Sequence, residues 1–172
     1  METMPELRKQ KILEELKSNG YHKGSSLADL YNVTRQVIVK DIAILRAEGN
    51  DIIATPKGYF LNTPGESKRI RKVIATKHQK ENIERELEII VDNGGKVLDV
   101  IVEHPVYGEI KANLMIDNRA DLASFMDNTK KRKAKPLSSL TDGVHLHTVE
   151  ADSREILERI VYQLDQEGLL IK

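Results

Sequence analysis

The residues best suited to chemistry in this chain are histidines. Five occur in 172 residues, and four lie in the C-terminal two thirds, at His78, His104, His145 and His147. His145 and His147 stand two apart in a β-prone stretch, so on a strand both imidazoles emerge from one face, roughly 7 Å apart, and can share one ion. Val144 and Leu146 would then face the core. Surface or hydrogen-bonded histidines are the alternative interpretation of this pair.

Composition limits what such a site can be made of. The chain has no cysteine, which excludes disulfides, thiolate ligands and thiol nucleophiles. Any metal must therefore bind to histidine, aspartate, glutamate or water. Neutral imidazole is a common ligand of zinc, nickel, copper and iron, and histidine nitrogens with one carboxylate form an adequate ligand set.

The elements that would position these histidines alternate between helix and strand. Apolar spacing and turn residues predict helices over 82–91, 119–128 and 153–166, and strands over 96–104, 109–116, 143–149 and 169–171. The fold class is therefore α+β, with a small α/β sandwich in the second half. The basic run at 130–133 falls between a helix and a strand, where we expect an exposed loop, and contact with DNA or an acidic partner is the alternative.

The first third predicts a helix-turn-helix. Apolar spacing indicates a helix over 5–18, then a short helix capped by Ser25 or Ser26, then a longer helix that Thr34 caps and Gly49 ends. The second helix of such a motif presents its N-terminal residues to the major groove. The residues expected to face DNA are Thr34, Arg35, Gln36 and Lys40.

A β-hairpin is expected after this helix. Residues 51–55 and 59–61 are β-prone and flank Pro56, Lys57 and Gly58, so we predict a wing with Lys57 on a phosphate and with Arg35 or Gln36 on base edges. The alternative is a generic small domain that binds another protein.

Length and charge set the organisation. A chain of 172 residues can hold two small cores, and we expect domains at 1–63 and 78–172 joined by a basic linker, 64–77. Arg69 and Arg71 in this linker either contact DNA phosphates or are solvated. The net charge is zero, and neither a membrane-spanning run nor a signal peptide is evident, so a cytoplasmic protein without membrane contact is expected.

Two resemblances carry these expectations further. The stretches Leu27-Ala28-Asp29-Leu30, Val33 to Ile42 and Leu45-Arg46 resemble the winged helix of biotin-repressor-type regulators, over about the first sixty residues. The stretches around His78, Glu86, 99–109 and 136–147 resemble the three-histidine (3H) domain over nearly the whole second half. That pair of domains is characteristic of niacin-responsive repressors of NAD biosynthesis and niacin-uptake genes.

The second resemblance implies a ligand set and an effector. His78, Glu86, His145 and His147 fall on the family's divalent-metal ligands, with nickel, zinc or iron as the metal, and nicotinate or a related pyridine is the implied effector. His104 and Tyr107 lie in another family motif, for which ligand binding is expected. An unbroken helix would separate His78 from Glu86 by about 12 Å along its axis, so we predict that His78 precedes the helix or that the helix bends.

Three functions remain to be distinguished. The first is a homodimeric repressor that binds operator DNA and responds to nicotinate beside a metal. The second is a regulator for which the metal itself is the signal. The third is a metalloenzyme in which the metal activates water. No nucleophile motif, phosphate loop or nucleotide fingerprint occurs, which favours a regulator over an enzyme.

Overall fold

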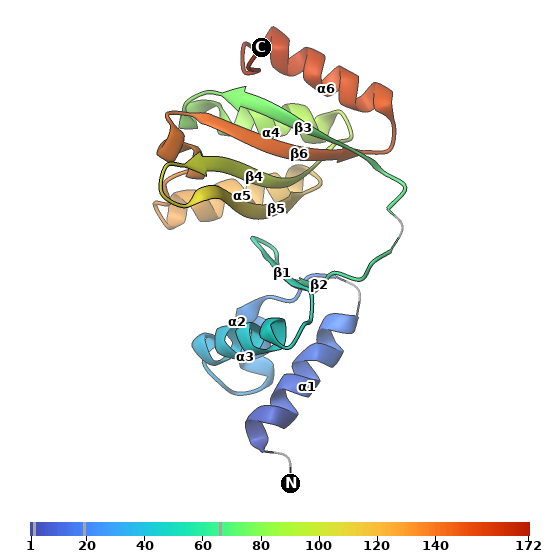
Figure 1. Ribbon diagram of the computed structural model, residues 1–172, viewed down its shortest axis with the longest axis vertical. Helices are drawn as coiled ribbons and strands as arrows, with labels where there is room; N and C mark the ends of the chain where they lie inside the picture. The colour runs from blue at the N-terminus through green and yellow to red at the C-terminus, as the bar shows by residue number, and fades with distance from the viewer. Residues whose placement is uncertain (2, 19, 66) are drawn as a thin grey trace. The chain divides into compact units, whose positions relative to one another are not determined.

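The structure is a computed structural model that describes residues 1, 3–18, 20–65 and 67–172. Its contacts divide the chain into two compact units, 1–66 and 67–172, which we describe separately (Figure 1). Within the described residues, no helix is both long enough and apolar enough to cross a membrane.

The first unit is a three-helix domain with a β-hairpin. Its helices are α1 (Met4–Lys17), α2 (Gly24–Leu30) and α3 (Arg35–Ala47). Thr34 caps α3 by accepting a hydrogen bond from the Val37 backbone N–H at 3.4 Å. One apolar face of each helix closes a common core, whose buried members include Ile12, Leu27, Ile38 and Ile42.

The hairpin consists of β1 (Ile52–Thr55) and β2 (Gly58–Leu61), which pair antiparallel. His22 adds a single bridge to Tyr59 on the other side of β2, through two backbone hydrogen bonds of 2.8 and 2.9 Å. Gly58 is required here, because its φ is +125° and a Cβ would lie 2.7 Å from the His22 carbonyl. Helix, turn, helix and wing therefore occur in the predicted order.

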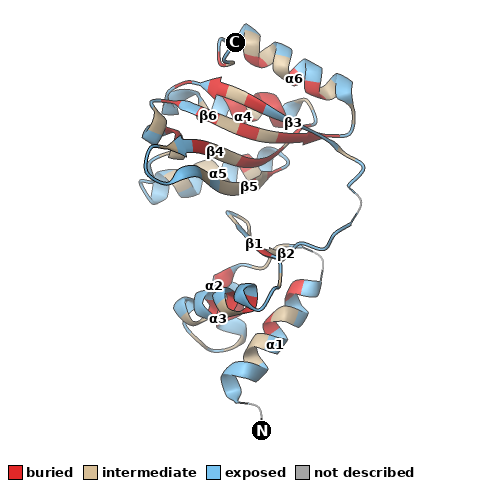
Figure 2. Cartoon of the chain, in the orientation of Figure 1, coloured by how far each residue is buried: buried red, intermediate tan, exposed pale blue. Residues whose placement is uncertain are grey.

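The second unit is a four-stranded antiparallel sheet with helices on one face. The strands β3 (Ile70–Lys77), β6 (Val144–Ala151), β4 (Lys96–His104) and β5 (Gly108–Ile116) lie side by side in the order β3-β6-β4-β5. Helices α4 (Ile83–Asp92) and α5 (Arg119–Lys131) lie behind the sheet, and α6 (Arg154–Gln166) joins them on the same apolar core (Figures 1 and 2). Short 3-10 turns occupy Lys80–Asn82 and Leu137–Thr141.

The core of this unit lies between that face and the helices. Val97, Val149 and Ala151 from the strands meet Ile90 and Ile160 from the helices, and all five are fully buried. We call the opposite side of the sheet the open face, because within 67–172 none of the three helices packs on it. The mixed helix and strand content confirms the α+β class.

Several expected boundaries are wrong. Residues 70–77, assigned to a linker, form β3, because their pairing with β6 buries Ile74 and Thr76; Glu66, also in that linker, lies outside the described residues. The helix α5 continues through Lys131, so Lys130 and Lys131 of the basic run are helical rather than in a loop. Exposed lysines are compatible with a helix, and nothing local ends it earlier.

Two smaller features also differ. Lys23 is the N-cap of α2 and makes no side-chain cap bond, so Ser25 and Ser26 lie inside the helix. Residues 169–171 form no regular strand. They add one bridge, Thr76 with Leu170, and two flanking hydrogen bonds to the outer edge of β3.

Candidate metal centre

Four residues that the sequence singled out meet inside the second unit. His78 follows β3 directly, Glu86 lies in the first turns of α4, and His145 and His147 lie on β6. His78 therefore precedes the helix, which is one of the two arrangements predicted from the separation of about 12 Å along an unbroken helix. The chain turns between β3 and α4, which brings the His78 ring back over Glu86.

The three imidazoles converge on one carboxylate oxygen. Glu86 Oε2 lies 2.6 Å from His78 Nε2, 3.1 Å from His145 Nε2 and 3.4 Å from His147 Nε2. Glu86 is 0% exposed and the three histidines are 3–7% exposed. We call these four residues the Glu86 cluster. It is a group of buried polar side chains, and the Thr76 hydroxyl, 3.0 Å from His145 Nε2, is buried beside it.

Each histidine of the cluster is oriented by a backbone carbonyl. The Nδ1–H of His78 donates to Gln79 O at 2.9 Å, that of His145 to Gly143 O at 2.8 Å, and that of His147 to Asp99 O at 2.6 Å. A neutral imidazole with its proton on Nδ1 has a free lone pair on Nε2, so these contacts select the tautomer whose Nε2 can coordinate a metal. All three rings therefore aim a potential ligand atom at one point.

The charges of the cluster depend on one another. Burial raises the pKa of Glu86, but the charge of His147 and hydrogen bonds from all three histidines hold it well below its usual range. Burial lowers the pKa of His78, yet the hydrogen bond to Glu86 and its charge bring it above the ordinary value. His147 is likewise raised against burial by the charge of Glu86. Without a cation, the buried carboxylate must be balanced by protons on its histidines.

A divalent metal fits this arrangement. One ligand atom each from His78, Glu86 and His145 lie within 4.8 Å of one another, and His147 Nε2 adjoins the same carboxylate. Glu86 Oε1 is buried and has no hydrogen-bond partner within the described part of the chain. Three imidazole nitrogens and one carboxylate are ligands that zinc, nickel and iron accept. The described residues could therefore hold such an ion.

Gly143 brings two of these residues together. Its carbonyl accepts the His145 Nδ1–H and, at 3.3 Å, the His78 backbone N–H. Its φ is +88°, and a Cβ would lie 2.5 Å from the His78 carbonyl oxygen. Only glycine permits this approach without strain. The role of Gly143 was not predicted, although a glycine two residues before a histidine pair is visible in the sequence.

The predicted orientation of β6 is wrong. His145 and His147 point to the helix-covered face, together with Val149 and Ala151, whereas Val144 is exposed and Leu146 is half-buried on the open face. The histidines face the helices because of a tertiary contact: α4 packs on that side of the sheet and brings Glu86 to His145.

His104 and Tyr107 lie at the turn between β4 and β5. The Nδ1 of His104 accepts hydrogen bonds from the backbone N–H groups of Val106 and Tyr107 at 3.1 and 3.2 Å, and the His104 and Tyr107 rings are 5.0 Å apart. These contacts favour a proton on Nε2, so His104 presents a donor where the cluster histidines present acceptors. Tyr107 is 78% exposed. Within the described residues, no hydrogen bond, ion pair or ring contact joins either residue to the Glu86 cluster.

The predicted DNA-contact residues lie on the first unit. Thr34, Arg35, Gln36 and Lys40 are exposed along the N-terminal half of α3. Lys57 is half-buried in the β1–β2 turn, with its ammonium 4.2 Å from the centre of the Tyr21 ring. That cation–π contact orients the lysine at the tip of the wing.

One ionic contact of α3 was not foreseen. Asp41 is buried, and Arg8 of α1 donates to both of its oxygens at 2.6 and 3.3 Å. Since the partners are 33 residues apart, no local pattern indicates the pair.

Arg69 and Arg71 are engaged within the second unit. Arg69 contacts Asp152 at 2.6 Å, and Arg71 contacts the buried Glu150 at 3.0 Å. The Ser67 hydroxyl donates to the same glutamate at 3.2 Å. These contacts favour a structural role at the entry to β3 over phosphate binding.

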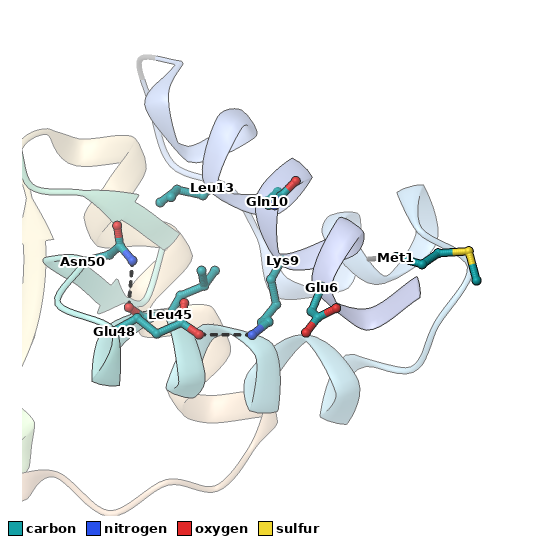
Figure 3. Close-up of a pocket in the computed structure, with 8 residues that line it drawn as sticks. All are labelled: Met1, Glu6, Lys9, Gln10, Leu13, Leu45, Glu48 and Asn50. Atoms are coloured by element: carbon teal, nitrogen blue, oxygen red, sulfur yellow. Dashed lines mark hydrogen bonds and ion pairs between the residues drawn. The ribbon is translucent and has the colours of Figure 1, made fainter. Parts of the chain in front are cut away.

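A surface hollow of about 510 Å³ lies between α1 and the end of α3 (Figure 3). Lys9 and Glu48 form a 3.1 Å ion pair there, and Asn50 donates to the Leu45 carbonyl at 2.9 Å. None of the predicted site residues lines it.

A helix-turn-helix with an exposed recognition helix, followed by a unit with a buried histidine cluster, defines a DNA-binding regulator. Family models agree with this division. A model described as "HTH domain" matches residues 8–60, and one described as "3H domain" matches residues 71–172.

Similar proteins give the same result along the whole chain. The chain is 42% identical to the "Probable transcription repressor NiaR" of Thermotoga maritima, over all of this chain and 98% of that protein. It is 39% identical to the "Transcription repressor NadR" of Bacillus subtilis, over 96% of this chain and 93% of that protein. The chain therefore belongs to the 3H-domain family of transcription repressors, as its motifs indicated, and is not an enzyme.

Proposed function

We propose that this chain represses genes of NAD biosynthesis or niacin uptake as a homodimer, and that it responds to nicotinate or a related pyridine bound beside a divalent transition metal. The observation that carries the sensing part is the Glu86 cluster, in which three Nδ1–H groups are tied to carbonyls and three Nε2 atoms face one buried carboxylate. Such outer contacts fix the tautomer and ring orientation of metal ligands.

The assigned roles follow from chemistry. His78, Glu86, His145 and His147 would hold nickel, zinc or iron, and the bound metal would offer a coordination position to the carboxylate or ring nitrogen of nicotinate. His104, with a donor on Nε2, and the exposed ring of Tyr107 suit a carboxylate and an aromatic ring respectively. The names of the relatives NiaR and NadR support the niacin and NAD assignment.

The DNA-binding part of the proposal rests on α3 and the wing. Arg35 and Gln36 have the paired hydrogen-bonding groups that read base edges, whereas Lys40 and Lys57 suit phosphates. Thr34 at the N-cap would place the first turn of α3 against the groove. A ligand in the second unit changes DNA affinity only if it binds differently in the DNA-bound and free states.

A regulator that responds to metal alone is the second candidate. The cluster provides four donors from one chain and is buried, so metal binding could by itself alter the second unit.

Operator binding under four conditions separates the two. The probe is a DNA fragment selected from a randomised library by the chain with nickel and nicotinate, and its affinity is measured with metal, with nicotinate, with both, and with neither. The niacin proposal expects the largest change with both together. If nicotinate has no effect at any metal concentration, that proposal fails and a metal-only response supports the second candidate.

A further inference from the structure

The open face of the sheet has an apolar centre. Val73 of β3 is 54% exposed and Val144 of β6 is 40% exposed. Leu146 pairs with Ala75 on one side and with Ile101 of β4 on the other, and all three are half-buried although no helix of the second unit covers them. Apolar side chains that cross three neighbouring strands are typical of an interaction surface.

Unpaired charges border this centre. Glu103 and Glu109 lie directly opposite each other on β4 and β5, and we call them the acidic pair. Like charges in this cross-strand position destabilise a sheet. Neither carboxylate has an ion-pair partner among the described residues, and Lys77, at the far edge of the same face on β3, has none either. The face therefore has an unpaired cation at one edge and unpaired anions at the other.

These positions are self-complementary. A two-fold axis that runs along the strands, between β6 and β4, exchanges β6 with β4 and β3 with β5. Leu146 then meets Ile101 of a second copy, and Lys77 meets Glu109 of that copy. The register supports this match. Leu146 pairs with Ile101, so Val144, two residues earlier on β6, lies level with Glu103, two residues later on β4. Lys77 pairs with Val144 and therefore lies level with the acidic pair. An isologous interface requires such reciprocal contacts.

We propose that the open face is the dimer interface, with the two sheets packed face to face. This interface rests on the homodimer of the proposed function. Leu146 of one copy packs on Ile101 of the other at the centre, and Lys77 contacts the acidic pair of the other copy at the rim. Four strands of this length give roughly 500 Å² of projected area. Standard interfaces bury about 800 Å² per partner, so a moderately stable dimer is expected.

Charge reversal tests the pairing in the full-length chain without DNA or nicotinate. Sedimentation velocity across a concentration series measures the dimer dissociation constant. We expect Lys77→Glu, and separately the Glu103→Lys/Glu109→Lys double variant, to raise it at least tenfold. Lys130→Glu on α5 makes the same charge change away from the sheet and should leave it unchanged.

Mixing the two charge-reversed proteins is the decisive measurement. In a heterodimer both rim contacts again join opposite charges, so the mixture should dimerise with a dissociation constant near that of the unsubstituted chain. Circular dichroism and metal content of each variant control for unfolding, which mixing would not repair.

Three results would overturn the inference: a monomer at every concentration, variants that dimerise normally, or a mixture that stays monomeric. Loss of the dimer on Leu7→Glu in α1, with the sheet variants unaffected, would place the interface on the first unit instead. Variants that dimerise normally would overturn the interface while the repressor proposal stands, whereas a monomer at every concentration would also contradict the homodimer of that proposal.

Discussion

The two units place their functional side chains in opposite environments. In the first unit, Arg35, Gln36 and Lys40 project into solvent from a helix whose other face forms the core. In the second unit, the Glu86 cluster lies within the core itself. Substitutions at the proposed DNA contacts of the first unit should therefore leave its fold unchanged, whereas in the second unit stability and the proposed metal binding depend on the same residues. Substitutions ranked by their effect on folding test this difference.

The largest effect is expected from His145→Ala/His147→Ala. The change leaves Glu86 buried with one imidazole partner, and breaking a buried charge pair in this way costs about 3–5 kcal/mol. Metal content should fall below roughly a tenth of that of the unsubstituted chain, since two of the four proposed ligands are lost. Urea unfolding with a chelator and elemental analysis measure the two effects. His104→Ala, in the exposed turn, is the control, and undiminished metal in the double variant would remove these residues from the site.

Gly143→Ala should have the next largest effect. A positive φ costs a non-glycine residue about 1–2 kcal/mol, and here the added Cβ also meets the His78 carbonyl. Displacing the carbonyl that orients His145 should weaken metal binding about 10- to 100-fold. Gly168→Ala is a matched control, because its φ is also positive, at +69°, but no atom lies within 4 Å of the new Cβ. Equal effects at both sites would mean that backbone strain alone is responsible.

Arg8→Ala tests a buried ionic contact of the first unit, whose proposed DNA-contact side chains are exposed. It leaves the buried Asp41 without its charged donor, which should lower the free energy of unfolding by about 2 kcal/mol. Lys9→Ala breaks the more exposed pair with Glu48 and should cost no more than about 1 kcal/mol. Thermal unfolding of both variants gives the comparison. If both variants unfold at the same temperature, the buried Arg8–Asp41 pair stabilises the first unit no more than the more exposed Lys9–Glu48 pair does.

Arg35→Ala should have the smallest effect on folding. An exposed substitution of this kind changes stability by no more than about 0.5 kcal/mol. Loss of a paired base contact weakens specific DNA binding by about 1–3 kcal/mol, roughly ten- to hundredfold. Arg46→Ala removes the same charge from the last turn of α3, so it should reduce affinity less and without sequence preference. A destabilised Arg35→Ala protein would contradict the division between the units.

Local patterns predicted what depends on local structure. The helix spacing located α1, α3, α4 and α6 to within a few residues. The axial rise of a helix predicted that His78 precedes α4 or that the helix bends, and the structure has the first arrangement. The cap at Thr34 is an interaction between neighbours in sequence, so the sequence alone sufficed.

Features that depend on distant partners were missed. Alternation along β6 separates histidines from Val144 and Leu146 but does not say which set meets α4, and the more apolar set was wrongly assigned to the core. The burial of Asp41 follows from Arg8. Residues 70–77 were assigned to a linker because the local sequence does not show that Arg69 and Arg71 contact acids about eighty positions away.

The contacts of Ser67, Arg69 and Arg71 determine where the chain can be divided. A fragment that starts at His78 would lack β3, and with it Thr76, whose hydroxyl lies 3.0 Å from His145 Nε2. A fragment that starts at Ser67 keeps the strand and its pairing with Glu150. Any exchange of the second unit onto another DNA-binding domain, by recombination or by protein engineering, should therefore join the two between Leu61 and Ser67.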